Sequence, residues 1–364
     1  MNIARQLHDL GQHLWLDNIT RELLTSGTLQ RYIEEFSVTG LTSNPSIFDK
    51  AISDSGVYDD AIHEKSAAGK SGESLFFELA LEDLTRAASL LRPAHDASGG
   101  DDGWVSLEVS PLLADETAAS IEAAAALHQR ANSPNLFIKI PGTPAGIPAV
   151  EEAIFAGVPV NVTLLFSREH YVAAAEAYMR GIERRLAAGL DPNVRSVASL
   201  FVSRWDVAVH DKVPAELRNR LGIAIAKRTY KAYREMLASP RWQKLATQGA
   251  RPQQLLWAST GTKDPDASDT LYVDSLVAAG TINTVPEKTL HALVDHGKPG
   301  AELPEDGGDA EAVIAAFEKA GVDDALLAAK LQHDGVLSFA KSWNELLDCI
   351  ASRSEQLARS VRAK

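Results

Sequence analysis

The sequence is poor in cysteine and has no long hydrophobic run. Its 364 residues include a single cysteine, Cys349, which excludes an internal disulfide framework and any metal site built from several cysteines. No stretch approaches the roughly 20 apolar residues of a membrane span, and the first residues lack the apolar core of a secretory signal. We therefore expect a cytoplasmic protein that has no membrane partner.

Positive charge and several common active-site motifs are also scarce. Lysine and arginine total 36 against 49 aspartates and glutamates, giving a net charge of −13. Such an acidic chain argues against a nucleic-acid partner, although it can still hold a local basic pocket for an anion. There is no HExxH, no Walker phosphate loop, no GxGxxG after the first strand and no G-x-S-x-G. These absences argue against zincin, P-loop, dinucleotide-binding and α/β-hydrolase chemistry.

Short apolar runs alternate with amphipathic helical segments along the whole chain. Helical patterns begin near residues 73, 116, 168 and 216. The candidate strands begin near residues 13, 38, 104, 136, 158, 194, 254 and 280. This alternation predicts the α/β class and a (β/α)₈ TIM barrel.

No low-complexity linker divides the chain, so we expect one barrel domain over residues 1–364. Residues 49–72 read as an insertion after the second strand. Residues 323–361 read as a C-terminal helical extension that packs on or over the barrel.

A lysine interrupts a run that otherwise has the pattern of a buried strand. In "NLFIKIPGTPAG", residues 135–146, Lys139 shares one face with Phe137, while aliphatic residues occupy the other. A charged amine in a dry interior costs several kcal/mol, so this amine should be paired or neutral. A lysine that reaches water from a strand end is the alternative that this stretch alone leaves open.

Other strands carry polar residues in the phase opposite to their bulky aliphatics. In a closed parallel barrel the uniformly aliphatic face meets the helices, so the polar face points inward, and active sites lie at the C-terminal mouth. A helix cap or a turn remains the alternative for any single one of them, above all for Asn44, which precedes Pro45. The inward polar residues are Asp17, Thr42, Asn44, Glu108, Asn161, Thr163 and Ser199.

A desolvated lysine surrounded by polar groups is suited to Schiff-base chemistry. Burial lowers the pKa of an amine in general and frees its lone pair for attack on a ketone. A protonated imine withdraws electrons, so a neighbouring C–C bond can break, provided a base takes the proton of the departing carbinol. Asp17 is the candidate for that base.

Ordered segments on seven strands resemble the transaldolase family, a branch of the class I aldolase barrels. These segments are "WLD", "TSNPS", "SLEV", "FIKIPGT", "NVTLLFS", "SLFVSR" and "WASTGTK", and they span nearly the whole chain. The resemblance implies a pentose phosphate pathway transferase. It would move a dihydroxyacetone unit from sedoheptulose 7-phosphate to glyceraldehyde 3-phosphate, giving erythrose 4-phosphate and fructose 6-phosphate. It also implies that no cofactor or metal is needed, and it raises a homodimer as a candidate assembly.

The resemblance assigns a role to each motif residue. Lys139 would form the imine with C2 of the ketose phosphate, and Asp17 would act as base on the C4 hydroxyl. Glu108 and Thr163 would hold the water that carries protons. Hydrogen bonds to the three-carbon unit would come from Asn44, Asn161 and Ser199.

A phosphate-binding arginine of the family corresponds to Arg204, and Phe201 belongs to the same substrate-binding motif. After strand seven many members carry a second arginine, whereas this chain reads "ASTGTK". Lys263, as a point charge, and Ser259, with its hydroxyl, are the candidates to replace it.

Two other functions stay open. A fructose-6-phosphate aldolase shares the barrel and the lysine but releases the three-carbon unit without an acceptor. Those enzymes are much shorter and usually carry Gln and Tyr where this chain has Glu108 and Phe201. A sugar-phosphate-binding barrel without catalysis would use the inward residues for recognition only.

Overall fold

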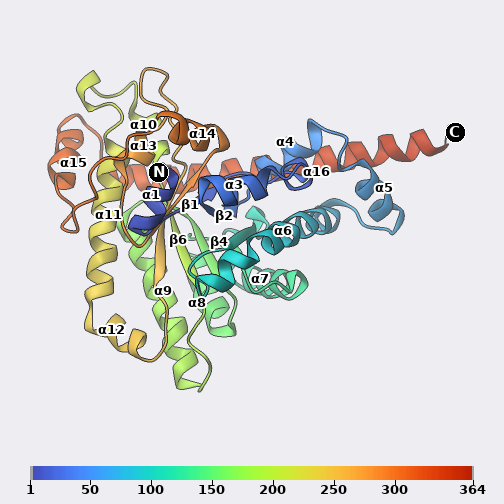
Figure 1. Ribbon diagram of the computed structural model, residues 1–364, viewed down its shortest axis with the longest axis horizontal. Helices are drawn as coiled ribbons and strands as arrows, with labels where there is room; N and C mark the ends of the chain where they lie inside the picture. The colour runs from blue at the N-terminus through green and yellow to red at the C-terminus, as the bar shows by residue number, and fades with distance from the viewer. Residues whose placement is uncertain (1–2, 363–364) are drawn as a thin grey trace.

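The computed structural model describes residues 3–362 and contains a closed barrel of parallel strands (Figure 1). Each strand pairs with the next along the chain, and the last pairs with the first. The strands are β1 (Gln12–Leu16), β2 (Val38–Thr42), β3 (Trp104–Glu108), β4 (Leu136–Pro141), β5 (Val160–Leu165), β6 (Ser196–Phe201), β7 (Gln253–Ala258) and β8 (Thr281–Val285). The predicted (β/α)₈ barrel and all eight of its strands are confirmed.

Helices connect the strands and cover the outside of the barrel (Figure 1). They are α1 (Ile3–Leu10), α2 (Arg21–Thr25), α3 (Thr28–Phe36), α4 (Pro45–Ser53), α5 (Asp59–Ala67), α6 (Gly72–Ala97), α7 (Thr117–Ala131), α8 (Gly146–Ala156), α9 (Arg168–Ala187), α10 (Ser203–Val209), α11 (Leu221–Ala238), α12 (Pro240–Thr247), α13 (Leu271–Ser275), α14 (Glu287–His296), α15 (Ala310–Lys319) and α16 (Asp324–Arg362). Short 3₁₀ turns lie at Pro111–Leu113 and Ala215–Leu217. Among residues 3–362, no helix is apolar over a stretch long enough to cross a membrane.

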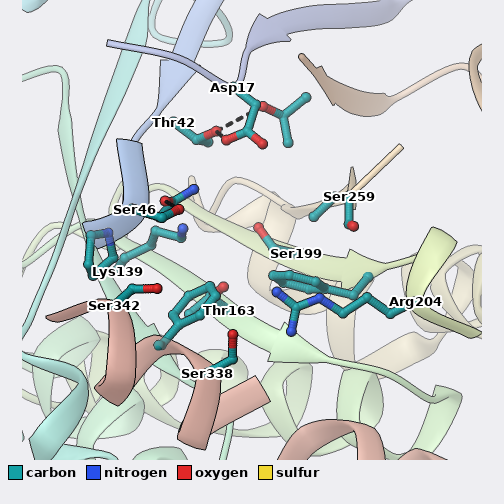
Figure 2. A pocket seen from close by; sticks show the side chains of 16 residues that line it. Asp17, Thr42, Ser46, Lys139, Thr163, Ser199, Arg204, Ser259, Ser338 and Ser342 are labelled. Carbon is teal, nitrogen blue, oxygen red and sulfur yellow. Dashed lines mark hydrogen bonds between the residues drawn. The ribbon is translucent and has the colours of Figure 1, made fainter. Parts of the chain in front are cut away.

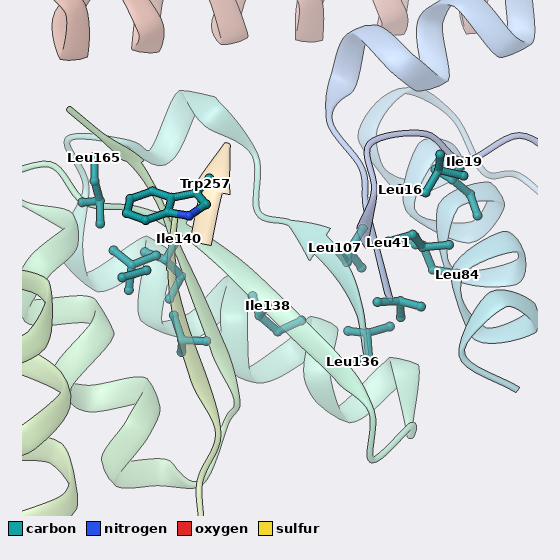
Figure 3. Close-up of a cluster of buried hydrophobic side chains, with 14 of the residues drawn as sticks. Leu16, Ile19, Leu41, Leu84, Leu107, Leu136, Ile138, Ile140, Leu165 and Trp257 are labelled. Carbon is teal, nitrogen blue, oxygen red and sulfur yellow. The ribbon is translucent and has the colours of Figure 1, made fainter. Parts of the chain in front are cut away.

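The outward faces of the strands form the larger core. Leu16, Leu107, Ile138 and Ile140 belong to this layer between barrel and helices, and Leu84 of α6 packs there too (Figure 3). Burying one such side chain contributes about 2 kcal/mol, so the aliphatic phase of each strand fixes which face turns outward.

The inward faces form a second core that is rich in aromatic rings. The Phe137 ring stacks on Trp104 with 4.0 Å between centroids, and Trp15 lies 6.1 Å from Phe137 on the other side. Trp104 and Phe137 lie at the beginnings of β3 and β4, and Trp15 lies two residues before Asp17. Polar side chains that follow on the same faces are therefore concentrated at the C-terminal mouth.

One residue departs from the alternation that the sequence predicts. Alternation with the inward Asn161 and Thr163 predicts an outward Leu164 in β5, but Leu164 packs in the inner core, and Leu165 takes the outward place. A register irregularity lies between Val162 and Leu165, and Leu164 has a left-handed backbone with φ of 59°. Such a bulge shifts the phase by one residue.

The long helix α16 crosses the barrel and continues beyond it beside α4 and α5 (Figure 1). Its beginning is tied to the barrel by Gln332, whose Nε2 donates to the carbonyls of Gly142 at 3.0 Å and Leu164 at 2.9 Å. Its far end is tied to α5 by Arg353, whose Nε lies 2.6 Å from Asp59 Oδ1. The expected insertion at 49–72 thus forms the end of α4 and all of α5, and both pack on the C-terminal helix.

At the opposite end of the barrel a carboxylate lies between two imidazoles. Asp102, just before β3, has Oδ2 at 3.1 Å from His8 Nε2 of α1 and Oδ1 at 2.6 Å from His13 Nδ1 of β1. The hydrogen bond that His8 donates to the Asp102 carboxylate raises the pKa of His8. The two histidines lower the pKa of Asp102, although its burial acts in the opposite direction. This cluster fixes the first helix to the base of the barrel.

Candidate active site

A polar pocket opens at the C-terminal ends of the strands, with walls from the barrel and from α16 (Figure 2). The space within it is about 680 Å³, part of which is open to solvent. The sequence-predicted residues on its walls are Asp17, Asn44, Lys139, Thr163, Ser199, Phe201, Arg204 and Ser259. The inward polar groups of separate strands therefore converge as expected.

Lys139 enters the pocket from β4, where it pairs in register with Glu108 of β3 and Asn161 of β5. The side chain is buried, and its Nζ donates to the carbonyl of Ser43 at 3.1 Å. The Glu108 Oε2 atom lies 3.5 Å from the same Nζ, a long contact for an ion pair. The lysine is thus paired inside the barrel, and the alternative of a strand-end lysine reaching bulk water does not hold.

Glu108 lies behind Lys139 and does not itself line the pocket. Burial raises the pKa of this carboxyl, and the nearby Lys139 ammonium opposes that rise without cancelling it. Within the described part of the chain, Glu108 Oε1 and Thr163 Oγ1 are both buried and have no hydrogen-bond partner. Two residues near Lys139 therefore each keep one polar atom free to bind a ligand or a water.

Asp17 is held by threonines of the neighbouring strands. Its Oδ1 accepts from Thr42 Oγ1 at 3.0 Å (Figure 2), and Thr42 Oγ1 lies 2.9 Å from Thr284 Oγ1 of β8. Its backbone N–H donates to Val285 at 2.8 Å, so β1 and β8 fix the end of the strand. Burial raises the pKa of Asp17, and Lys139 is the largest opposing influence. The carboxylate can therefore both take and return a proton in this pocket.

A buried amide fixes the Ser199 hydroxyl. Ser199 Oγ donates to Asn161 Oδ1 at 2.7 Å, and Asn161 Nδ2 donates to Ser106 Oγ at 3.1 Å. Ser199 lines the pocket, whereas Asn161 lies one layer below it. The two residues predicted to bind the same ligand thus form a connected pair.

Asn44 satisfies both interpretations that the sequence allows. Its Oδ1 accepts from the backbone N–H of Ile47 at 3.1 Å and from Ser46 Oγ at 2.6 Å, which makes it the N-cap of α4. The same side chain lines the pocket. Because the cap uses the oxygen, the amide nitrogen is the group that Asn44 can offer to a ligand.

Arg204 lies beside two aromatic rings. Its guanidinium carbon is 5.0 Å from the Phe201 ring centroid and 5.6 Å from that of Phe339 on α16. Burial lowers its pKa, and the carboxylates of Glu108 and Asp17 oppose that effect. Among residues 3–362, no carboxylate forms an ion pair with this guanidinium, so its N–H groups can bind an anion.

The segment after β7 brings one of its two predicted residues to the pocket. Ser259 lines the wall with a left-handed backbone, φ of 56°, and its Oγ lies 2.9 Å from Ser203 Oγ. Lys263 is exposed and lines a neighbouring hollow with Asp206 and His210 instead.

Several wall residues were missed by the sequence reasoning. Thr284 shares the inward phase of β8 with Ile282, whereas the polar Thr281 and Asn283 fall in the opposite phase, so alternation along this strand gives no signal for it. The others lie on α16, where a serine pair four residues apart beside an aromatic residue is a weaker signal for one helix face. The missed wall residues are Pro45, Ser46, Ala258, Thr284, Ser338, Phe339 and Ser342, together with Thr42, which had been placed on the inward face without a role.

Comparison with known proteins gives a consistent result over nearly the whole chain. Residues 14–350 match the family model described as transaldolase/fructose-6-phosphate aldolase. A protein named transaldolase from Parafrankia sp. (strain EAN1pec) is 44% identical, covering 96% of this chain and 98% of its own length. Proteins of the same name from Thiobacillus denitrificans and Neisseria meningitidis serogroup C are 44% and 41% identical, each covering 95% of this chain and 99% of their own length.

Proposed function

The chain belongs to the transaldolase/fructose-6-phosphate aldolase family and is a transferase of the transaldolase type that acts on sugar phosphates, and we propose that Lys139 carries its reaction as a Schiff base. The observation that carries this assignment is the buried Lys139 amine, which touches one carbonyl and one carboxylate at the floor of the pocket. A lysine in that place can exchange its proton with Glu108 and attack a carbonyl carbon.

Imine formation needs a group that both gives and takes protons beside the amine. Lys139 Nζ attacks C2 of the ketose phosphate, and the resulting carbinolamine loses its hydroxyl as water. The raised pKa of Glu108 favours a carboxyl that can donate the proton for that loss. The free Oε1 of Glu108 and the free Oγ1 of Thr163 support their proposed role in holding a water that relays the proton.

Cleavage and transfer require a base at the other side of the bound sugar. Asp17 takes the proton of the C4 hydroxyl, the C3–C4 bond breaks, and the aldose phosphate leaves an enamine on Lys139. The enamine then attacks the aldehyde carbon of the acceptor, and Asp17 returns the proton to the new hydroxyl. Hydrolysis of the imine releases the product. Thr42 and Thr284 hold Asp17 in one orientation through this cycle.

Positioning of the two ends of the substrate follows from the remaining wall residues. Ser199 and Asn44 are proposed to contact the hydroxyls of the three-carbon unit, and Asn161 acts on that unit through its hydrogen bond to Ser199. Arg204 binds the phosphate, because it is the wall cation without a carboxylate partner in the described chain. Sedoheptulose 7-phosphate and glyceraldehyde 3-phosphate are the proposed donor and acceptor.

Borohydride trapping tests the assignment. Reduction of the protein in the presence of fructose 6-phosphate should add a stable three-carbon adduct to Lys139, located by mass spectrometry of peptides. Lys139→Ala should abolish both the adduct and turnover, whereas Lys341→Ala, at an exposed position of α16, should change neither. An adduct on another lysine would refute the site assignment, and no adduct at all would favour a barrel that only binds sugar phosphates.

A second assay separates the transferase from a lyase. We expect fructose 6-phosphate to be consumed at a useful rate only when erythrose 4-phosphate is supplied as acceptor. Rapid release of free dihydroxyacetone without an acceptor would indicate a fructose-6-phosphate aldolase instead.

Three broader interpretations stay predictions. We propose that residues 1–364 act as one domain, that the protein is cytoplasmic, and that it forms a homodimer. Light scattering on the purified protein tests the last of these.

A further inference from the structure

We propose that the C-terminal helix α16 completes the phosphate subsite, with Ser338 as a ligand beside Arg204 and Phe339 as the residue that positions the guanidinium. This inference rests on the proposed function, because it assumes a phosphorylated sugar in the pocket. It gives a catalytic-site role to a segment that contributes no strand to the barrel.

One stripe of α16 faces the pocket. Gln332, Gly335, Phe339 and Ser342 follow each other at spacings of three and four residues, and Ser338 lies beside Phe339, so they share a helix face. Gln332 fixes the rotation of the helix through its hydrogen bonds to two buried carbonyls of the barrel. The serine and phenylalanine side chains therefore have a defined direction.

The helix approaches Arg204 closely at a glycine. A Cβ on Gly335 would lie 3.0 Å from Leu164 Cδ2 and 3.4 Å from an Arg204 Nη atom. Ser338 and Phe339 come one turn later on the same face, and both line the pocket that Arg204 lines. Figure 2 shows the Ser338 hydroxyl pointing from α16 into the pocket, on the side where Arg204 lies.

The two aromatic rings contact the Arg204 guanidinium from one side. Phe201 comes from the barrel and Phe339 from α16, with ring centroids 6.5 Å apart, and each attracts the guanidinium by a cation–π contact. The N–H groups in the plane of the guanidinium can then bind two phosphate oxygens together. Phe339 acts only through Arg204 in this arrangement.

The third phosphate oxygen needs another donor, and Ser338 is placed to supply it. Lys263, the cation expected to replace the family's second arginine, does not line this pocket. The Ser259 hydroxyl already shares a hydrogen bond with Ser203. Among residues 3–362, no group forms a hydrogen bond with the Ser338 hydroxyl, which lies at the rim of the pocket.

Competition by inorganic phosphate tests the subsite. The inhibition constant of phosphate against fructose 6-phosphate should rise about ten-fold in Ser338→Ala, the effect of losing one hydrogen bond to a charged group. The KM for fructose 6-phosphate should rise with it, while kcat at saturation stays within about two-fold. Ser352→Ala, at an exposed position of the same helix, is the matched control.

A test of Phe339 must separate its proposed effect on Arg204 from a general role in packing. Phe339→Leu should raise the inhibition constant of phosphate. Phe339→Tyr keeps the aromatic ring, so its inhibition constant should equal that of the unmodified protein. Borohydride trapping of unphosphorylated dihydroxyacetone on Lys139 should remain normal in all these variants, since that ligand carries no phosphate.

The outcomes distinguish this inference from the proposed function. An unchanged inhibition constant in Ser338→Ala, with normal trapping at Lys139, overturns the inference and leaves the proposed function intact. A loss of dihydroxyacetone trapping in Ser338→Ala also overturns it, because the residue would then act on the imine site. Failure of the unmodified protein to trap any ketone at Lys139 overturns the proposed function itself.

Discussion

Replacement of Asp17 by asparagine should separate imine formation from C–C bond cleavage. The substitution keeps an oxygen that can accept the hydrogen bond from Thr42, so the side chain should stay in place. It removes the group that takes the proton of the C4 hydroxyl. A positioned general base contributes roughly 10²–10⁴-fold, so turnover should fall by at least about 10².

The pH dependence gives a second, independent measure of the same residue. The base must be ionised to act, and burial raises the pKa of Asp17 above its usual value of 3.8. The rate of cleavage should therefore fall on the acid side at a higher pH than an exposed aspartate would give. This limb should be absent from the residual activity of Asp17→Asn.

Rapid-quench measurements can read the two steps separately. Borohydride added at early times counts the imine on Lys139, and a coupled assay counts the aldose phosphate that cleavage releases. Asp17→Asn should form the imine at a rate close to that of the unmodified protein and release product slowly. Equal loss of both steps would refute the assigned role, and Thr42→Val serves as a variant that disturbs the orientation of Asp17 without removing its carboxylate.

Three further predictions concern stability. The pKa of His8 is raised by Asp102, so their contact stabilises the fold fully below about pH 6.5, and this stabilisation is lost as the pH rises through the raised pKa. Asp102→Asn should therefore lower the melting temperature more at pH 6 than at pH 9. An equal decrease at both pH values would contradict this. Burial raises the pKa of Asp206 to about 6, so its ionisation opposes folding. The unfolding free energy of the unmodified protein relative to Asp206→Asn should therefore fall by about 2 kcal/mol between pH 4 and pH 7 in urea titrations. A pH-independent difference would show that the carboxyl is not titrating there. Gln332→Ala leaves two carbonyls without their donor and should lower the free energy of unfolding by about 2 kcal/mol or more. Hydrogen exchange in α16 should become faster. Unchanged exchange would mean that other contacts hold the helix.

The barrel and much of the site could be predicted from the sequence because the signals are local. Alternation along each strand decides which residues face inward, and parallel register then brings Glu108 and Asn161 to either side of Lys139. Asp17 and Ser199 follow from the same rule, since Asp17 comes directly after β1 and Ser199 lies in the second half of β6, each on the inward phase. No knowledge of distant contacts is needed for these residues.

The remaining parts depend on contacts between distant segments. The bulge at Leu164 exchanges the expected faces of two leucines, and this irregularity is paired with a helix more than a hundred residues later through Gln332. A loop without periodicity gave no phase for Lys263, which lines a neighbouring hollow although its charge opposes the rise that burial causes in the pKa of Asp17. Ser338 carries an ordinary helical pattern, and its place over the mouth follows from docking of the whole helix.

The packing of α16 on α4 and α5 has a consequence for folding during synthesis. The eighth strand ends at Val285, so a growing chain can close its barrel before the helix that bears Ser338 has left the ribosome. That barrel would present the lysine but lack one wall of its pocket. The ion pair of Asp59 with Arg353 joins an early segment to α16, so a helix that is synthesised after all eight strands also completes the enclosure around a reactive amine.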